Sequence, residues 1–129
     1  MATVCIAIGI GTRPEAIKLA PVVRALEAQA GRFRPVVVLT SQHRQLLRQA
    51  LRDFRISAQH DFHIMRPNQN LSYVATEVLR KSSALFTRVR PDLLLVQGDT
   101  TTALAMAQAA FYAGIPIGHV EAGLRTHDL

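Results

Sequence analysis

Two acidic side chains, Asp99 and Glu121, each stand just beyond a short run of apolar residues. A carboxylate at the end of a buried strand is expected to lose part of its solvent, and desolvation raises its pKa toward values that suit proton transfer. The two residues are therefore candidates for a general acid and a general base. The structural alternatives are a helix cap for Asp99 and a salt bridge from Glu121 to Arg125 or Arg13.

A glycine-containing turn in the first loop offers a second kind of chemistry. Gly9 and Gly11 resemble the start of a dinucleotide-binding fingerprint, but Pro14 replaces its third glycine and no acidic residue ends the next strand, so NAD binding is disfavoured. A Walker A loop is absent, because no Gly-Lys-Ser/Thr sequence occurs. Pro14 suits the first position of a helix, and free N–H groups at a helix start attract anions. With Arg13 and Lys18 nearby, this segment is predicted to be either a phosphate site or an ordinary capped helix start.

The elements that must position these side chains alternate along the chain. Short apolar runs predict strands at residues 4–10, 36–39, 61–65, 93–96 and 115–120, and helical periodicity predicts helices over 15–30, 43–54, 71–89 and 103–112. Successive βαβ units with right-handed crossovers favour an α/β, Rossmann-like parallel sheet with helices on both faces. Ligands bind beyond the carboxyl ends of such strands, so the loops that carry the candidate residues are expected to share one rim.

Composition bounds the class of protein. The 129 residues, 49% of them apolar, predict a single domain over residues 1–129. The lone Cys5 excludes an internal disulfide and a four-cysteine zinc site, and it favours a reducing compartment, with the cytoplasm as the default. Asp61 and His63 lack a completing set of ligands, so no metal site is predicted. No basic region precedes the first apolar stretch and no apolar run approaches the ~18 residues that span a bilayer, so neither secretion nor a membrane span is expected.

The positive charge of the chain favours an anionic partner. The formal net charge is +6, and four arginines at helical spacing form a basic stripe: Arg44, Arg48, Arg52 and Arg55. This stripe is the one feature that favours nucleic acid. Because no aromatic residues are interleaved with it, a solvated helix face is the preferred interpretation.

Four runs of residues together carry a resemblance to a known family. They are Gly11-Thr12-Arg13-Pro14-Glu15-Ala16-Ile17-Lys18, Gln42-His43-Arg44, Gln97-Gly98-Asp99-Thr100-Thr101-Thr102 and His119-Val120-Glu121-Ala122-Gly123-Leu124-Arg125-Thr126. The runs resemble the amino-terminal domain of the bacterial non-hydrolysing UDP-N-acetylglucosamine 2-epimerases. The first and last are long and specific, and the resemblance extends from the first strand to the last residue.

This resemblance implies a fold and a reaction. The fold would be the amino-terminal half of a glycosyltransferase B type structure, whose active site lies between this domain and a carboxyl-terminal nucleotide-binding domain that is absent from this chain. The reaction would interconvert UDP-N-acetylglucosamine and UDP-N-acetylmannosamine. The C2 proton and UDP leave, a 2-acetamidoglucal forms, and UDP adds back with C2 inverted. No redox cofactor is needed, and the product would serve polysaccharide biosynthesis.

The resemblance also implies roles for single residues. Asp99 and Glu121 match acidic active-site positions and would carry the acid and base work or support it electrostatically. Arg13 and Lys18 match cationic positions that would stabilise the diphosphate as the C1–O bond breaks.

A second set of positions concerns activation. Gln42 and Gln45 resemble positions at which some relatives bind a second, activating UDP-N-acetylglucosamine molecule. Asn68 stands where some of those relatives have an arginine. Ser41 and His127 stand where glycine is common in the family.

Family members are much longer than this chain, which leads to the main hypothesis. The chain would be the amino-terminal part of such an epimerase, inactive alone and completed by a carboxyl-terminal domain or partner chain, with a homodimer left open. One alternative is a stand-alone regulatory module that binds a nucleotide sugar or phosphate without catalysis. A nucleic-acid binder is the third interpretation, in which binding would depend on the basic stripe and weaken steeply with salt.

Overall fold

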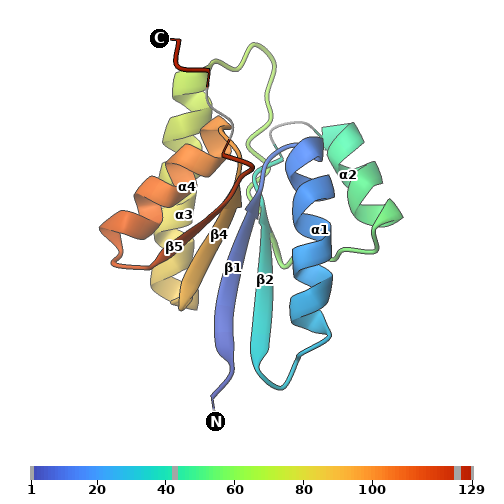
Figure 1. Ribbon diagram of the computed structural model, residues 1–129. Helices are drawn as coiled ribbons and strands as arrows, with labels where there is room; N and C mark the ends of the chain where they lie inside the picture. Colours follow the sequence, from blue (N-terminus) through green and yellow to red (C-terminus); the bar gives the residue numbers. More distant parts are fainter. Residues whose placement is uncertain (1, 42–43, 124–125, 129) are drawn as a thin grey trace.

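A computed structural model describes residues 2–41, 44–123 and 126–128. Its elements in chain order are β1 (Val4–Ile10), α1 (Arg13–Glu27), β2 (Phe33–Leu39), α2 (Arg44–Asp53), β3 (His60–Asp61), α3 (Leu71–Val89), β4 (Leu93–Gln97), α4 (Thr101–Tyr112) and β5 (Ile117–Val120). The amino terminus lies at one end of the sheet, and α1 begins at the other end (Figure 1).

The strands form one sheet in the order β3-β2-β1-β4-β5, and every neighbouring pair is parallel. In the centre, Ile8 of β1 lies between Val37 of β2 and Leu95 of β4. The chain runs outward from β1 to β3 and then returns across β1 to β4, so the order reverses between β1 and β4. The predicted Rossmann-like α/β class is confirmed, and the reversal marks the place where sheets of this kind bind ligands.

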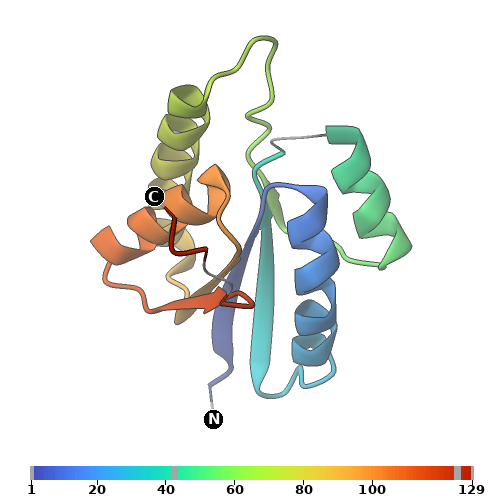
Figure 2. The same cartoon turned by 45° about the horizontal axis from the view of Figure 1, so that its top comes forward.

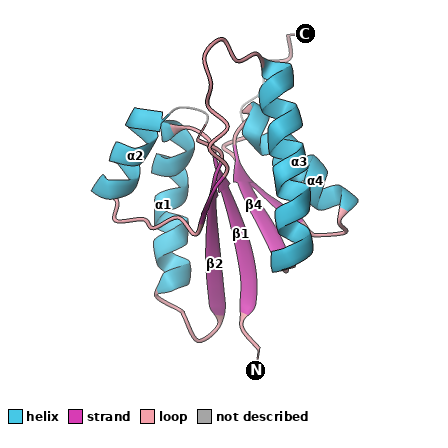
Figure 3. Ribbon diagram, turned by 180° about the vertical axis from the view of Figure 1, so that it is seen from behind, coloured by secondary structure: helices cyan, strands magenta, loops and turns pink. Residues whose placement is uncertain are grey.

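Two pairs of helices cover opposite faces of the sheet. Ile6, Ile8 and Ile10 belong to one buried cluster with α1 and α2, whereas Cys5 and Ala7 belong to another with α3 and α4. Figure 3 shows α3 and α4 together on one side of the sheet. Because the central strands are buried on both faces, their sequences are continuous apolar runs rather than alternating ones.

Two glycines of the first strand and loop let α4 approach closely. A Cβ atom on Gly9 would overlap the sulfur of Met106, and one on Gly11 would overlap the hydroxyl of Thr102 and lie 2.9 Å from Oγ1 of Thr40. Thr40 and Thr102 are both fully buried, and their hydroxyls are 3.1 Å apart in a hydrogen bond. The first residues of α4 therefore pack directly against the end of β1.

The predicted third strand is only partly right. Residues 61–65 were expected to form it, but the strand covers only His60–Asp61. His63 has a left-handed backbone with a φ of 50°, which ends the extended conformation. Two further bonds to the second strand and its loop remain, from the Phe62 N–H to the Leu39 carbonyl and from the Ile64 N–H to the Thr40 carbonyl.

The other boundaries shift by a few residues. The first helix begins before residue 15 because Pro14 occupies its first turn, and it ends at Glu27, after which residues 28–32 form a turn. The last strand begins at Ile117 rather than Ile115, because the Ile115 N–H still bonds back to the Ala110 carbonyl at the end of α4.

Candidate active site

A buried carboxylate organises the start of α1. Glu15 is 1% exposed, and its Oε2 accepts hydrogen bonds from the Gly11 N–H at 2.9 Å, the Thr12 N–H at 2.6 Å and the Thr12 hydroxyl at 2.8 Å. Thr12 is the N-cap residue and Glu15 the third residue of the helix, which is the spacing of a capping box. The loop after β1 is thereby folded onto the first turn of α1.

This geometry confirms the capped helix start that was one of the two predictions for the first loop. An anion at a helix start uses free backbone N–H groups. Here the N–H groups of Gly11 and Thr12 already donate to the Glu15 carboxylate, so these two donors are not free for an anion. A phosphate site in this region stays a prediction, with Arg13 and Lys18 as its candidate side chains.

The turn after β4 is tied to the same carboxylate. The Thr100 hydroxyl donates to Oε1 of Glu15 at 2.7 Å and accepts from the Ala103 N–H at 3.1 Å as the N-cap of α4. Gly98 precedes it with a φ of 74°, a left-handed conformation that favours glycine. Asp99 stands between these two residues, so its backbone is held from both sides. The cap of α4 is Thr100, which leaves the carboxylate of Asp99 without a capping role.

The loop after β5 lies against the same turn. The Gly98 N–H donates to the Val120 carbonyl at 3.1 Å, and Oε2 of Glu121 lies 3.7 Å from the position that a Cβ on Gly98 would occupy. The other oxygen of Glu121 accepts from the Ala122 N–H at 2.7 Å. The loops after β4 and β5, which carry Asp99 and Glu121, therefore adjoin each other at the carboxyl ends of the strands. Figure 2 turns this end of the sheet toward the viewer.

His119 of β5 adds a polar group beside Asp99. Its Nε2 is 2.7 Å from the Gly98 carbonyl, so this ring nitrogen carries the proton. The ring is exposed rather than part of the core. His119 and Asp99 line the same cavity of about 380 Å³, whose wall between α4 and β5 is mainly apolar and includes Leu104 and Ile117.

The two candidate acids are not desolvated as expected. Asp99 and Glu121 are both exposed. Asp99 lies two residues beyond the end of β4, Glu121 directly follows β5, and β5 is an edge strand. The structure brings the two loops together but leaves both carboxylates in water.

The two candidate cations lie on different flanks of α1. Arg13 lines a cleft of about 180 Å³ between α1 and α2, together with Ile17 and Leu46. Lys18 is five residues further on, which turns it by roughly 140° around the helix from Arg13. Both are exposed, and within the described ranges neither forms an ion pair with Asp99 or Glu121. A pocket shared by Arg13 and Lys18 with the two acids therefore stays a prediction.

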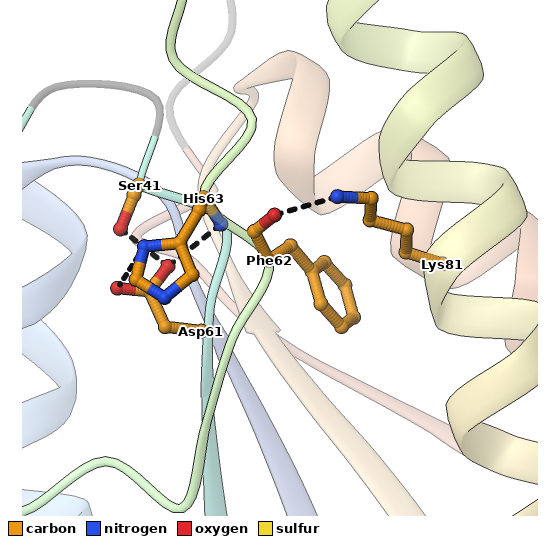
Figure 4. A network of polar contacts seen from close by, with 5 residues as sticks. All are labelled: Ser41, Asp61, Phe62, His63 and Lys81. Atoms are coloured by element: carbon orange, nitrogen blue, oxygen red, sulfur yellow. Dashed lines mark hydrogen bonds and ion pairs between the residues drawn. The ribbon is translucent and has the colours of Figure 1, made fainter.

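A second polar network lies at the same edge, beyond β2 and β3 (Figure 4). Oδ1 of Asp61 accepts from the Ser41 hydroxyl at 2.5 Å and from the His63 N–H at 2.9 Å, and its Oδ2 lies 3.5 Å from Nδ1 of His63. Lys81 of α3 donates to the Phe62 carbonyl at 2.7 Å. Ser41 and His63 are both left-handed, with φ values of 56° and 50°, and the one carboxylate holds both.

Of the two residues that resemble an activating site, Gln42 and Gln45, the structure describes only Gln45. Gln42 lies outside the described residues. Gln45 is exposed on α2, where it borders a shallow hollow together with Arg48 and Arg52. Arg48 and Arg52 point into solvent, as the solvated-face interpretation of the basic stripe expects.

The described part of the chain contains neither a candidate metal-ligand cluster nor a candidate membrane-spanning helix. Among residues 2–41, 44–123 and 126–128, no group of three or more His, Cys, Asp or Glu side chains could hold a metal ion. Within the same ranges, no helix is long and apolar enough to cross a membrane.

Comparison with known proteins assigns the family. The family model described as UDP-N-acetylglucosamine 2-epimerase matches residues 24–129. This chain belongs to that family. The UDP-N-acetylglucosamine 2-epimerase of Yersinia pestis is 51% identical over 119 residues, and that of Escherichia coli K12 is 50% identical over the same length. Each alignment covers 92% of this chain but 31% of the relative, so the chain spans about a third of the length of the curated relatives it matches.

Solved structures of the family have the same fold. The UDP-GlcNAc 2-epimerase from Neisseria meningitidis, bound to UDP-GlcNAc, matches with a TM-score of 0.89 and 45% identity over 97% of this chain and 34% of its own. The enzyme from Methanocaldococcus jannaschii, in complex with UDP-GlcNAc and UDP, matches with a TM-score of 0.88 and 31% identity over 96% of this chain and 34% of its own. The resemblance of the four sequence runs to this family is thus confirmed, and the five-stranded domain is the Rossmann-like part of a glycosyltransferase B type fold.

The sequence did not predict the buried residues whose hydrogen bonds hold the loops of the site. No separate role is predicted for Glu15 from the sequence, although Thr-x-x-Glu before an apolar run is the signal of a capping box. Two long-range hydrogen bonds have no local sequence signal, because their partners are 62 or more residues apart. They join Thr100 to Glu15 and Thr40 to Thr102.

Proposed function

We propose that this chain supplies the amino-terminal half of the active site of a UDP-N-acetylglucosamine 2-epimerase. The observation that carries the proposal is the adjoining placement of the Asp99 and Glu121 loops, in a domain that matches a UDP-GlcNAc-bound relative with a TM-score of 0.89. The proposed reaction interconverts UDP-N-acetylglucosamine and UDP-N-acetylmannosamine by elimination and re-addition of UDP.

The elimination route requires proton transfer at C2, for which the two acids are the candidates. A carboxylate takes the C2 proton while the C1–O bond breaks and its electrons leave with UDP. A second acid group, which exchanges its proton with solvent, then protonates the opposite face of C2 as UDP adds back to C1, so atoms and charge balance over the cycle. Asp99 and Glu121 are the carboxylates of this domain that project from adjoining loops at the strand ends, and we assign proton transfer and its electrostatic support to this pair.

The cations act on the leaving group. A diphosphate gains negative charge as the C1–O bond breaks, and a nearby guanidinium or ammonium lowers the energy of that transition state. Arg13 and Lys18 are exposed at the start of α1 and available for this contact. Because they lie on different flanks of the helix, we expect them to reach different parts of the UDP moiety.

The rest of the site must come from further protein. Both acids are exposed, and catalytic carboxylates are more effective when water is excluded from them. We propose that a carboxyl-terminal nucleotide-binding domain, on the same or a partner chain, covers this edge and holds most of the uridine nucleotide. The proposal is supported by the 31% share of the relatives' length that this chain covers. Gln42 and Gln45 stay candidates for binding an activating second substrate molecule.

The cellular setting follows from the same assignment. We place the protein in the cytoplasm, which is supported by its unpaired, buried Cys5. The product would be consumed in polysaccharide biosynthesis, and a homodimer is compatible with the proposal.

A chimaeric enzyme tests the proposed function. Residues 1–129 would replace the matching amino-terminal third of the Escherichia coli relative, to which they are 50% identical over 119 residues. We expect the chimaera to form UDP-N-acetylmannosamine from UDP-N-acetylglucosamine and residues 1–129 alone to form none, measured by ¹H NMR of the anomeric signals.

Two outcomes would contradict the proposal. Turnover by residues 1–129 alone would show that no second half is needed. A folded chimaera that binds UDP-N-acetylglucosamine without turning it over would favour the regulatory binding module instead.

A further inference from the structure

Glu15 has more partners than a helix cap requires. A capping box needs one carboxylate oxygen to receive the N–H of the N-cap residue. Oε2 of Glu15 does this and also receives the Gly11 N–H and the Thr12 hydroxyl, which leaves Oε1 free for a different bond. A buried carboxylate is costly unless hydrogen bonds satisfy it, and four donors do so here.

The bond from Oε1 links two distant parts of the chain. Its donor is the hydroxyl of Thr100, 85 residues away in sequence, and the same hydroxyl caps α4 by accepting from the Ala103 N–H. An unbroken hydrogen-bonded path therefore runs from the Gly11 and Thr12 amides through Glu15 and Thr100 to the first turn of α4. The starts of α1 and α4 are fixed relative to each other by one side chain.

The residues flanking this path are those with proposed chemical roles. Arg13 directly follows Thr12, and Asp99 directly precedes Thr100. In the part of the chain that the structure describes, neither the Arg13 nor the Asp99 side chain forms a hydrogen bond or ion pair with Glu15, so any effect of Glu15 on them passes through the backbone of the two loops. Proton transfer depends steeply on the placement of the catalytic group, and a 1 Å displacement can cost on the order of 10²-fold in rate.

We propose that Glu15 is a positioning residue that locks the Asp99 turn to the start of α1 in the epimerase site. This inference rests on the proposed function for its catalytic consequence, whereas the coupling of the two loops is a property of the chain itself. Glu15 couples the two loops through hydrogen bonding rather than through its charge. Four donors face the carboxylate and, in the described part of the chain, no cation pairs with it.

The choice of variants follows from that distinction. In Glu15→Gln, the amide oxygen can still accept from the Gly11 and Thr12 amides, and its NH₂ group can donate to the Thr100 hydroxyl, which has a second lone pair available. Glu15→Ala loses both links. Thr100→Val removes the link between the loops together with the N-cap bond from the Ala103 N–H, and Thr100→Ser, which keeps the hydroxyl, is its matched control. Glu27→Ala changes an exposed glutamate at the other end of α1.

The first test uses residues 1–129 and needs no activity. Amide chemical shifts and hydrogen exchange would be recorded by NMR for residues 98–103. We expect Glu15→Ala and Thr100→Val to shift these signals and to lower the exchange protection of the Ala103 amide. Glu15→Gln, Thr100→Ser and Glu27→Ala should leave them close to the parent spectrum. If Glu15→Ala fails to fold, the two Thr100 variants decide through the amide signals of Gly11 and Thr12, which lie at the other end of the path. Thr100→Val should shift these two signals and Thr100→Ser should not. Unchanged Gly11 and Thr12 signals in Thr100→Val would overturn the coupling.

The second test separates positioning from mere stability in the chimaeric enzyme. Positioning predicts that kcat per folded molecule falls on the order of tenfold to a hundredfold in Glu15→Ala, while KM changes little and Glu15→Gln restores the rate. A purely structural role would lower the folded fraction and leave kcat unchanged, and that result would refute the proposal. An inactive parent chimaera would count against the proposed function, and the NMR comparison would then decide the loop coupling by itself.

Discussion

At the scale of single residues, burial separates the acids that build the site from the acids available for chemistry. Glu15 is almost fully buried, and its two carboxylate oxygens accept hydrogen bonds from four donors. Asp99 and Glu121 stand on adjoining loops and are open to solvent. A carboxylate whose oxygens are all engaged is poorly suited to accept a proton, whereas an exposed one can meet a substrate.

Cys5 provides a prediction at this scale. The thiol is 5% exposed, and burial raises its pKa above the ordinary value, against an opposing effect of Arg34. We expect iodoacetamide to alkylate Cys5 slowly in the folded chain and rapidly in denaturant, as followed by mass spectrometry. Rapid alkylation under native conditions would contradict the packing of β1 between its helices.

The same raised pKa gives a pH dependence of defined sign. Above the pKa of the unfolded thiol, the unfolded chain loses its proton first, so the contribution of Cys5 to stability is present at lower pH and is lost as the pH rises. The free energy of unfolding should therefore decline more steeply at alkaline pH in the parent chain than in Cys5→Ala. Equal slopes in urea titrations of the two proteins would contradict this interpretation.

Residue roles were predictable from sequence only where the motif was long. The runs containing Asp99 and Glu121 indicate which loops meet, because strand ends in a parallel sheet share an edge. Their exposure was not predictable, since it depends on which layer covers the strand ends. From sequence, Asp61 and His63 indicate only an incomplete metal site. Their network with Ser41 was not predictable, because left-handed backbone at Ser41 and His63 has no sequence signal comparable to glycine.

At the scale of elements, the contact between β1 and α4 sets the geometry of the site. The capping threonine of α4 bonds to α1, and the first turn of α4 lies against the loop after β1. The order reversal between β1 and β4 provides the opening into which these loops project. The site is thus built from two helix starts and three strand ends rather than from one continuous motif.

Gly11→Ala tests this contact. The added methyl group would overlap the buried hydroxyl of Thr102 and press on Thr40, so the free energy of unfolding should fall by about 1–3 kcal/mol. The matched control is Gly31→Ala, where nothing lies within 4 Å of the new atom. Chemical denaturation measures both, and equal stabilities of the two variants would show that α4 does not approach β1 as closely as described.

Elements with strong periodicity were predictable, and irregular ones were not. The helix over residues 71–89 and the strand over residues 4–10 match the prediction fully, since each has a clear pattern and a clear end. The short β3 was overestimated because apolar residues beyond Asp61 continue an apparent strand pattern. Ile64 is buried, but in a loop under the helices rather than in the sheet.

At the scale of the whole molecule, the proposed function assigns half of an active site to this chain. Its sheet has two covered faces and a core of its own, while the proposed chemistry lies at one edge where both acids face solvent. The chain covers 31% of the length of its curated relatives. Fold class and family were both accessible from the sequence. The three longer runs of the resemblance lie at the ends of β1, β4 and β5.

The most direct test of the account is the transfer of a solvent proton to C2 of the substrate. In D₂O the chimaera of residues 1–129 and the Escherichia coli relative would be incubated with UDP-N-acetylglucosamine, and deuterium at C2 would be measured by NMR and mass spectrometry. Asp99→Asn and Glu121→Gln are compared with the control Glu27→Gln, which changes an exposed acid far from the rim. The account predicts that incorporation falls on the order of 10²-fold or more in both site variants and is unchanged in the control. Incorporation at the parent rate in both site variants would contradict it.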